Sequence, residues 1–387
     1  MERIFLSVLL AAFCLAASAQ EKFGLAHGPY LQEVTPDGAT VVFLTNAKAI
    51  SFVDMKPHGA SDAQAVRFYA SKDGLKAANT TFHAIRLDKL APGSKYDYRI
   101  FSKELRELQP YKAIFGDSIA SEWFTFSTPD PNKKGASIFI TSDMHGKPEK
   151  LAELLNLADY NSCDAIFYAG DMMNYFNEAD TPFKTFIDKS VEMFASTRPF
   201  EVVRGNHETR GAFARSFSGY FPKKNGKIYG SYKVGDAFVV MLDCGEDKAD
   251  SHWAYSGLTD YESYRTEQAE WLRELVKTPE YKKARYRIVI SHFPMIMTPD
   301  CREGEEKWLG WQDAIDKFLP ILNEAKVDLM VSGHTHRFLY HERGAANNRF
   351  PILEQGHDSA TRLELRNGKI GLKVIDTEGK ILRDCVL

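Results

Sequence analysis

Hydrophobic and polar residues alternate in short runs over the first third of the chain. Turn residues separate the runs, which cover residues 40–44, 65–69, 82–87, 96–100 and 123–126. Alternation with a period of two is typical of strands with one buried face. Several short strands at this spacing indicate an all-β sandwich. We therefore predict a β-sandwich domain over residues 20–127.

A different pattern begins after residues 128–135, a polar segment with two prolines that we predict to be a linker. Hydrophobic runs suited to strands cover residues 137–140, 165–168, 201–203, 238–242, 287–290 and 328–331. Between them, helical periodicity covers residues 150–158, 262–276 and 311–325. This alternation predicts an α/β domain over residues 136–387. The pairs Asn367-Gly368 and Glu378-Gly379 predict closing antiparallel hairpins.

The N-terminus has the pattern of a secretory signal. Arg3 precedes an apolar stretch over residues 4–15, and the small residues Ala17-Ser18-Ala19 follow. We expect residues 1–19 to be removed after Ala19, which makes the protein secreted or periplasmic. The alternative, a membrane anchor, is disfavoured because the apolar run is too short to span a bilayer. We therefore expect no membrane span in the mature chain.

Composition narrows the function classes further. The 387 residues include 49 Lys and Arg against 52 Asp and Glu, and the net charge is −3. Nucleic acid binding usually needs a basic field, so we expect none here. Export permits disulfides, but the sequence assigns no pairing. The cysteines of the mature chain are Cys163, Cys244, Cys301 and Cys385. The sequence does not indicate an oligomeric state.

Polar side chains with metal-binding chemistry follow five of the predicted strands. They are Asp143, His145, Asp171, Asn206, His292, His334 and His336. In α/β sheets, functional groups gather at the carboxyl ends of the strands, so residues nearly 200 positions apart can converge. Carboxylate, imidazole and amide ligands without thiolates suit Zn, Mn or Fe. The sequence therefore predicts a metal site at these strand ends.

The ordered series Asp143-x-His145, Gly170-Asp171, Gly205-Asn206-His207-Glu208, His292 and Gly333-His334-x-His336 resembles the calcineurin-like metallophosphoesterase superfamily. The resemblance covers residues 136 to about 356. The front domain resembles the fibronectin type III pattern, and the whole mature chain is similar to purple acid phosphatases. The resemblance implies a fibronectin type III-like β-sandwich followed by an α/β metallophosphoesterase domain with two sheets flanked by helices.

The same resemblance implies two divalent or mixed-valence transition-metal ions, drawn from Fe, Zn and Mn. It assigns one ion to Asp143, His145, Asp171 and His336. It assigns the other to Asp171, Asn206, His292 and His334, with Asp171 as the bridge. Two dications, two carboxylates and a hydroxide leave a formal charge of about +1, which matches an anionic ester. We expect a small phosphorylated substrate.

The implied reaction is hydrolysis of phosphate monoesters by attack of a metal-bound hydroxide. The catalytic residues would be Asp171, His207 and Glu208. His207 would protonate the leaving alkoxide or stabilise the phosphoryl oxygens, and Glu208 would orient it. Candidate substrate-binding residues are Asn174, His252, Tyr255 and Arg302. The alternative for the aromatic residues in these loops is simple packing.

One departure from the purple acid phosphatase pattern concerns the metal ligands. That family usually has Asp-x-Gly in the first motif and a tyrosine three residues after the bridging aspartate. Here His145 replaces the glycine, and Asn174 occupies the tyrosine position, with Tyr175 one residue later. We expect His145 to replace the tyrosine as ligand, and we expect no tyrosinate-iron centre.

Two other functions fit parts of the sequence. A phosphodiesterase of the nucleotide or glycerophosphodiester type would use the same ligands. A secreted, non-catalytic binding module would keep only the scaffold. Loss of at least one metal ligand would be expected in such a module, and all seven are present.

Overall fold

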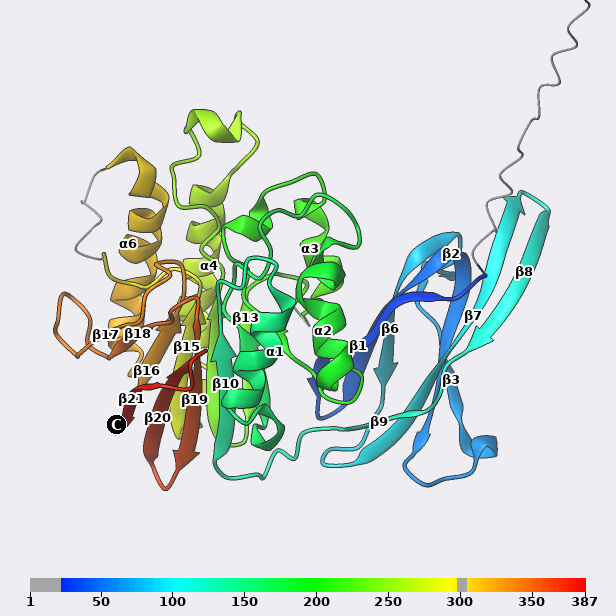
Figure 1. Cartoon of the computed structure of the whole chain (residues 1–387), viewed down its shortest axis with the longest axis horizontal. Coiled ribbons are helices and arrows are strands. Elements are labelled where there is room, and N and C mark those ends of the chain that lie inside the picture. The colour runs from blue at the N-terminus through cyan, green and yellow to red at the C-terminus, as the bar shows by residue number, and fades with distance from the viewer. Residues whose placement is uncertain (1–21, 224, 298–304) are drawn as a thin grey trace, which may run out of the picture.

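The computed structural model of the chain describes residues 22–223, 225–297 and 305–387. An antiparallel β domain precedes an α/β domain, as the hydrophobic pattern predicted (Figure 1). The first domain ends with β9 (Phe124–Ser127), and the second begins with β10 (Ala136–Thr141). The predicted leader, Cys301 and Arg302 lie outside the described residues.

Two long strands, β2 (Gly38–Pro57) and β7 (Lys95–Gln109), organise the β domain. The first half of β2 pairs with β1 (Leu25–Thr35) and β6 (Thr80–Asp88), and its second half pairs with β3 (Val66–Phe68) and β7. Strand β7 also pairs with β8 (Lys112–Ala120) and β9. Side chains from both halves of β2 share one core, so the strands form two packed layers.

The α/β domain contains two six-stranded sheets. The first has the order β12 (Glu201–Val202), β11 (Ala165–Tyr168), β10, β19 (Ser359–Arg366), β20 (Lys369–Asp376) and β21 (Ile381–Val386). Strands β10 to β12 are parallel, and the last three form the predicted antiparallel hairpins. The parallel strands direct their carboxyl ends to one edge of the sheet.

The second sheet has the order β13 (Gly230–Val234), β14 (Ala237–Leu242), β15 (Tyr286–Ser291), β16 (Leu329–Ser332), β18 (Ile352–Glu354) and β17 (Leu339–His341). Strands β14, β15, β16 and β18 are parallel. Fully buried residues of both sheets, such as Phe167 and Ile288, belong to one core cluster. The sheets therefore pack face to face.

Helices cover the outer faces of both sheets (Figure 1). The three predicted helices correspond to α1 (Pro148–Leu157), α4 (Tyr261–Leu275) and α6 (Leu309–Glu324). Helix α4 buries Arg265, Gln268, Ala269 and Leu272, the spacing of one helical face. Short helices are α2 (Asp188–Ser190), α3 (Phe217–Tyr220) and α5 (Pro279–Lys283). Among the described helices, none combines the length and apolarity needed to cross a bilayer.

The two domains share a buried interface. The Tyr30 hydroxyl donates to the Tyr220 carbonyl at 2.8 Å, and the Tyr98 hydroxyl donates to the Ser196 carbonyl at 2.7 Å. The Tyr30 ring packs against Phe183 and Phe200, with ring centroids 5.8 Å apart in each pair. Paired backbone carbonyls and a common apolar cluster fix the β domain against the first sheet and its helices.

Among the described cysteines, Cys163, Cys244 and Cys385 are free thiols. Burial raises the pKa of Cys163 to about 11 and that of Cys244 to about 12. Both are therefore protonated, unreactive thiols at neutral pH.

Candidate metal centre

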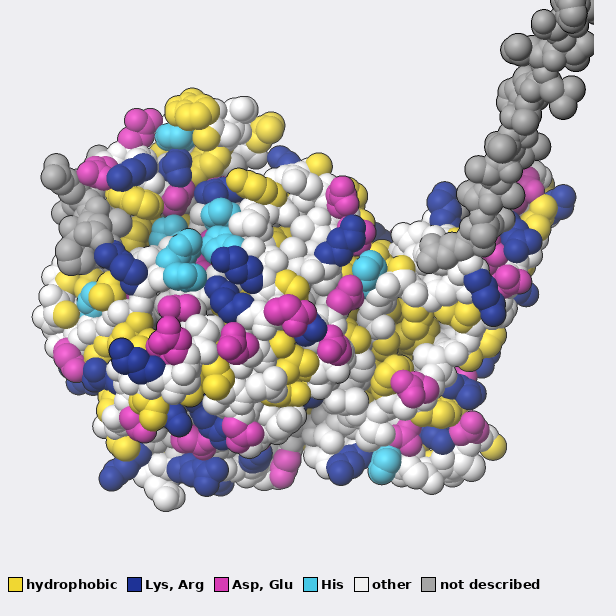
Figure 2. All heavy atoms as spheres, in the orientation of Figure 1, with side chains coloured by type: hydrophobic (Ala, Val, Ile, Leu, Met, Phe, Trp, Pro, Cys, Tyr) yellow, Lys and Arg dark blue, Asp and Glu magenta, His cyan; other side chains and the backbone are white. Residues whose placement is uncertain are grey.

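The predicted ligands converge at one edge of both sheets. Asp143 and His145 follow β10, Asp171 follows β11, and Asn206 follows β12. From the second sheet, His292 follows β15, and His334 and His336 follow β16. Figure 2 shows histidine side chains gathered on this face of the α/β domain. The facing sheets thus supply ligands from opposite sides of one site.

Four of the seven residues form one ligand group. Asp143, His145, Asp171 and His336 each offer one atom, and these atoms lie within 4.8 Å of one another. His145 Nε2 is 3.0 Å from His336 Nε2, and His336 Nε2 is 3.3 Å from Asp143 Oδ1. Neighbouring ligand atoms about 2.1 Å from one ion are roughly 3–4 Å apart. The group therefore fits a single transition-metal ion.

Two of the remaining residues lie close to Asp171: His292 forms an ion pair with it, and Asn206 precedes His207, whose backbone N–H donates to Asp171 Oδ1 at 2.9 Å. His292 Nδ1 donates to the Ala169 carbonyl at 2.8 Å, and its Nε2 atom lies 3.2 Å from Asp171 Oδ2. His292 Nε2 and Asn206 Oδ1 are both buried without a hydrogen-bond partner. An unpaired buried acceptor costs about 1–3 kcal/mol. A cation shared with Asp171 would satisfy both atoms, so these residues fit a second ion.

Burial and charge interactions set the protonation states of the candidate ligands. Burial disfavours the charged carboxylates, but His292 beside Asp171 and His336 beside Asp143 lower the pKa of both carboxyls below the usual value. Burial lowers the pKa of His334 to about 3, so its ring is neutral. Burial favours the neutral form of His292, but the Asp171 carboxylate beside it raises the pKa of that ring to about 10. Binding of a divalent metal at His292 therefore has to displace a proton.

The backbone is left-handed at five of the seven residues. The φ angles are +57° at Asp143, +49° at His145, +53° at Asp171, +75° at His334 and +60° at His336. Non-glycine residues adopt this conformation at a cost of about 1–3 kcal/mol each, and such positions cluster at functional sites. Each of these residues turns the chain at the end of its strand, where the candidate ligands lie.

Two glycines of the motifs, Gly170 and Gly205, lie where there is no room for a side chain. A Cβ atom at Gly205 would lie 2.2 Å from Asp171 Oδ1, and one at Gly170 would lie 2.6 Å from His292 Nδ1. Any larger residue would displace a candidate ligand. The glycines therefore permit the approach of adjacent strand-end loops.

His207 lies beside the ligand cluster without belonging to the four-residue group. Its Nδ1 atom donates to the Asn174 carbonyl at 3.0 Å. Its Nε2 atom accepts from Arg210 Nη1 at 3.2 Å and lies 3.9 Å from Asp171 Oδ2. One ring nitrogen is thus tied to the backbone, and the other faces the cluster.

The structure corrects the role expected for Glu208. Its fully buried carboxylate accepts from the backbone N–H groups of Asp171 at 2.9 Å, Met172 at 2.7 Å, Met173 at 3.2 Å and Gly205 at 2.8 Å. All four hydrogen bonds go to the backbone of the loops after β11 and β12, and none is formed with the His207 ring. The reason is geometric, because the short 3-10 turn that contains both residues places Glu208 beneath the site. Glu208 supports the Asp171 loop, whereas the Asn174 carbonyl holds His207.

The candidate substrate residues occupy different surroundings. Asn174 Oδ1 accepts from His145 Nδ1 at 3.1 Å, so Asn174 fixes a candidate ligand. The Tyr255 hydroxyl donates to Glu246 Oε2 at 3.0 Å and its ring lines a pocket beside the site. His252 Nδ1 instead accepts the Ala254 N–H at 3.2 Å, which caps a turn of its own loop.

Sequence reasoning missed three buried pairs that hold the strand-end loops. Arg204 Nη2 lies 2.7 Å from Asp243 Oδ2 and ties the Asn206 loop to the end of β14. Arg210 binds Glu246 through two bonds of 2.8 Å. Thr335, between two candidate ligands, donates to Glu354 at 2.6 Å. The strand-end rule that found the ligands would also have found Asp243, which directly follows β14.

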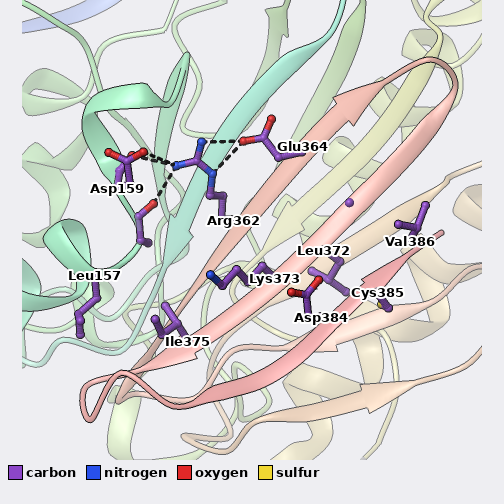
Figure 3. Close-up of a pocket in the computed structure, with 12 residues that line it drawn as sticks. Leu157, Asp159, Arg362, Glu364, Leu372, Lys373, Ile375, Asp384, Cys385 and Val386 are labelled. Atoms are coloured by element: carbon purple, nitrogen blue, oxygen red, sulfur yellow. Dashed lines mark hydrogen bonds and ion pairs between the residues drawn. The ribbon is translucent and has the colours of Figure 1, made fainter.

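A separate pocket lies between the end of α1 and strands β19 to β21 (Figure 3). None of the seven predicted ligands lines it. Its Arg362 donates to Glu364 Oε1 through Nε and Nη2, and to the Ala158 and Asp159 carbonyls through Nη1. Because these donors are already bonded within the protein, the Arg362 guanidinium is not free to bind a phosphate group.

The sequence of this chain is similar to those of known phosphoesterases. The family model for calcineurin-like phosphoesterases matches residues 136–338. Purple acid phosphatase 21 from Arabidopsis thaliana is 24% identical over 297 residues, which cover 74% of this chain and 57% of that protein. A probable inactive purple acid phosphatase 27 from the same plant is 25% identical over 285 residues, which cover 66% of this chain and 43% of that protein. The chain spans about half the length of the curated relatives it matches.

The fold has a counterpart among solved structures. The structure of purple acid phosphatase PPD1 from seeds of yellow lupin (Lupinus luteus) aligns with a TM-score of 0.67 at 16% identity. The alignment covers 92% of this chain and 73% of that chain. It therefore includes both the β domain and the α/β domain.

Proposed function

Because the chain belongs to the calcineurin-like phosphoesterase family, we propose that it is a dinuclear metal-dependent hydrolase of phosphate monoesters. One observation carries the proposal. Asn206 Oδ1 and His292 Nε2 are buried without a hydrogen-bond partner, and His292 Nε2 lies 3.2 Å from Asp171 Oδ2, which belongs to the four-residue ligand group. Two adjacent cation sites sharing Asp171 account for all of these atoms.

The proposed ligand assignment follows the two groups. Asp143, His145, Asp171 and His336 would hold one ion. Asp171, Asn206, His292 and His334 would hold the other. When bound, two divalent ions would supply charge neutralisation for the ester and acidify a water molecule.

The chain's own residues would manage the proton of the leaving group. His207 Nδ1 is held by the Asn174 carbonyl, so a second proton on the ring must reside on Nε2. That nitrogen faces the cluster and can donate to the leaving oxygen. Arg210 Nη1, 3.2 Å from the same nitrogen, can stabilise negative charge on the phosphoryl group.

The proposal includes export of the protein to the cell surface or periplasm. It rests on the leader pattern of residues 1–19, which lie outside the described part of the chain. The substrate would then be a small phosphorylated compound outside the cytoplasm.

The test combines metal analysis with kinetics on the full mature chain. After reconstitution with Zn, Mn or Fe, we expect two ions per chain and hydrolysis of an aryl monoester above that of an aryl bis-ester and a nucleotide. Asp171→Asn should lose activity, whereas Asp88→Asn, on the β domain, should lose none. One ion or none in wild type, together with an active Asp171→Asn variant, would falsify the dinuclear proposal. Faster hydrolysis of the bis-ester would identify a diesterase.

A further inference from the structure

A pocket of about 530 Å³ opens beside His207, between residues 204–215 and residues 246–264. This volume lies within the range of roughly 300–1,000 Å³ typical of small-ligand sites. The second segment leaves β14, rises beyond the sheet edge and returns as α4 (Figure 1). Hydrophobic side chains lie above the histidines in the space-filling view (Figure 2).

Arg210 connects this pocket to the candidate metal centre. Glu246 fixes its guanidinium through Nε and Nη2, both at 2.8 Å, so that Nη1 is directed to His207 Nε2 at 3.2 Å. The same side chain lines the pocket. A group bonded to a phosphoryl oxygen near His207 would therefore extend past Arg210 into the pocket.

The pocket lining includes three tyrosine rings and two arginines whose guanidinium groups form ion pairs within the protein. Tyr255 and Tyr264 line it, and their hydroxyls bind Glu246 and Asp243 at 3.0 and 2.8 Å. Because these hydroxyls are already bonded within the protein, the rings are the surfaces left to a ligand. Tyr261 lies 5.6 Å from the Arg204 guanidinium. Aromatic rings and guanidinium planes both stack on flat aromatic groups.

The charges of the two buried arginines are already balanced. Arg204 is paired with Asp243, and Arg210 is paired with Glu246. Their attraction for a second anionic group is correspondingly reduced. Leu258, with 70% of its surface exposed, adds apolar area at the rim.

We propose that this pocket receives the alcohol portion of the ester and that this portion is a planar aryl group. The inference rests on the proposed hydrolase function and specifies its substrate class. When the phosphorus–oxygen bond breaks, the released alcohol carries its new proton on the oxygen nearest His207. Its ring then lies among the tyrosines.

The test fills the pocket and compares two leaving groups on the metal-loaded full chain. Ala254, which is exposed and lines the pocket, is replaced in Ala254→Trp. The control is Trp253→Ala, an adjacent residue that is 81% exposed and does not line the pocket. We expect kcat/KM for 1-naphthyl phosphate to fall at least about tenfold in Ala254→Trp, mainly through KM, because the lost contacts are made before the chemical step. Values for ethyl phosphate should stay within about twofold.

Binding of the product 1-naphthol, measured by calorimetry, gives a readout independent of hydrolysis. It should be detected for wild type and Trp253→Ala and lost in Ala254→Trp. If Ala254→Trp does not fold, Leu258→Ala replaces it, with an expected threefold loss confined to the naphthyl substrate. Equal losses on both esters, or unchanged naphthol binding, would overturn the inference. Naphthol binding without hydrolysis of either ester would support the pocket and reject the hydrolase function.

Discussion

His207 occupies a position suited to proton transfer because its two ring nitrogens have separate partners. The Asn174 carbonyl holds Nδ1, and Nε2 faces the cluster next to Arg210. A histidine restrained in this way keeps its second nitrogen directed at the reacting group. Its side chain is not required to complete the four-residue metal group.

We therefore expect His207→Ala to retain two metal ions and to lose about 10²–10⁴ in rate on alkyl esters, the usual contribution of a general acid. The loss should be smaller for 4-nitrophenyl phosphate, whose leaving group needs no proton. Steady-state kinetics and elemental analysis measure both effects. His58→Ala, in the β domain, is the matched control. Equal losses on alkyl and nitrophenyl esters would assign His207 to charge stabilisation.

Tyr175 is the second residue whose role can be tested directly. Its side chain is 52% exposed, and the preceding Asn174 side chain is bonded to His145. We expect iron-reconstituted protein to lack the intense visible band of a tyrosinate-iron pair, because His145 provides the ligand in place of a phenolate. Absorption spectra of wild type and Tyr175→Phe should coincide. A strong band that disappears in Tyr175→Phe would show that the tyrosine binds iron.

At the level of single elements, the loop after β16 depends on a bond to β18. Thr335 lies between His334 and His336 and donates to Glu354 Oε2 at 2.6 Å, and His341 on β17 binds the other carboxylate oxygen at 2.5 Å. This network fixes the loop that presents two candidate ligands. Groups that orient metal ligands contribute about 10–100-fold to metal affinity.

Thr335→Val should therefore weaken metal binding about 10–100-fold, because it removes the hydroxyl but keeps the branched shape. Competition with a chelator of known affinity measures the effect. Thr335→Ser restores the donor and should recover most of the affinity. Unchanged affinity in Thr335→Val would show that the loop holds its shape without Glu354.

The Asp171 loop depends on Glu208 in a comparable way. Four backbone N–H groups point at its two carboxylate oxygens. In Glu208→Gln, an amide group would face two of these donors, which should lower the free energy of unfolding by about 1–3 kcal/mol. Chemical denaturation measures this change, and Glu178→Gln, on an exposed loop, serves as control. A variant of normal stability whose kinetic loss depends on the leaving group would instead support the original catalytic role.

For the whole molecule, the interface between the domains determines how the chain unfolds. Tyr30 is fully buried, packs against Phe183 and Phe200 and binds the Tyr220 carbonyl. The β domain therefore contributes side chains to the core cluster of the first sheet and its helices. Such sharing couples the two domains energetically.

We expect Tyr30→Ala to cost about 3–5 kcal/mol, the usual effect of truncating a large buried ring. Calorimetry should show one transition for both domains, shifted to lower temperature. Tyr111→Ala, at a fully exposed hairpin tip, should leave the transition unchanged. Two separate transitions, with that of the α/β domain unaffected by Tyr30→Ala, would contradict the coupling.

The order of strands and helices was readable from the sequence because it depends on local periodicity. A period of two marked β6, a continuous apolar run marked β10, and apolar spacing of three and four marked α4 and α6. The candidate ligands could also be predicted from the sequence, because each follows a predicted strand. In parallel strands the carboxyl ends share one edge, so residues such as Asp143 and His292 can be grouped without knowing their distance.

Only the tertiary structure decided how these residues are held. Glu208 adjoins His207 in the chain, yet its partners are backbone amides near Asp171, more than 30 positions away. Asn174 contacts His145, and Arg204 contacts Asp243, through bonds between different strand ends. The left-handed backbone at Asp143 and Asp171 likewise has no sequence signal. Each of these features depends on how the strand-end loops pack against one another, and local periodicity carries no information about that packing.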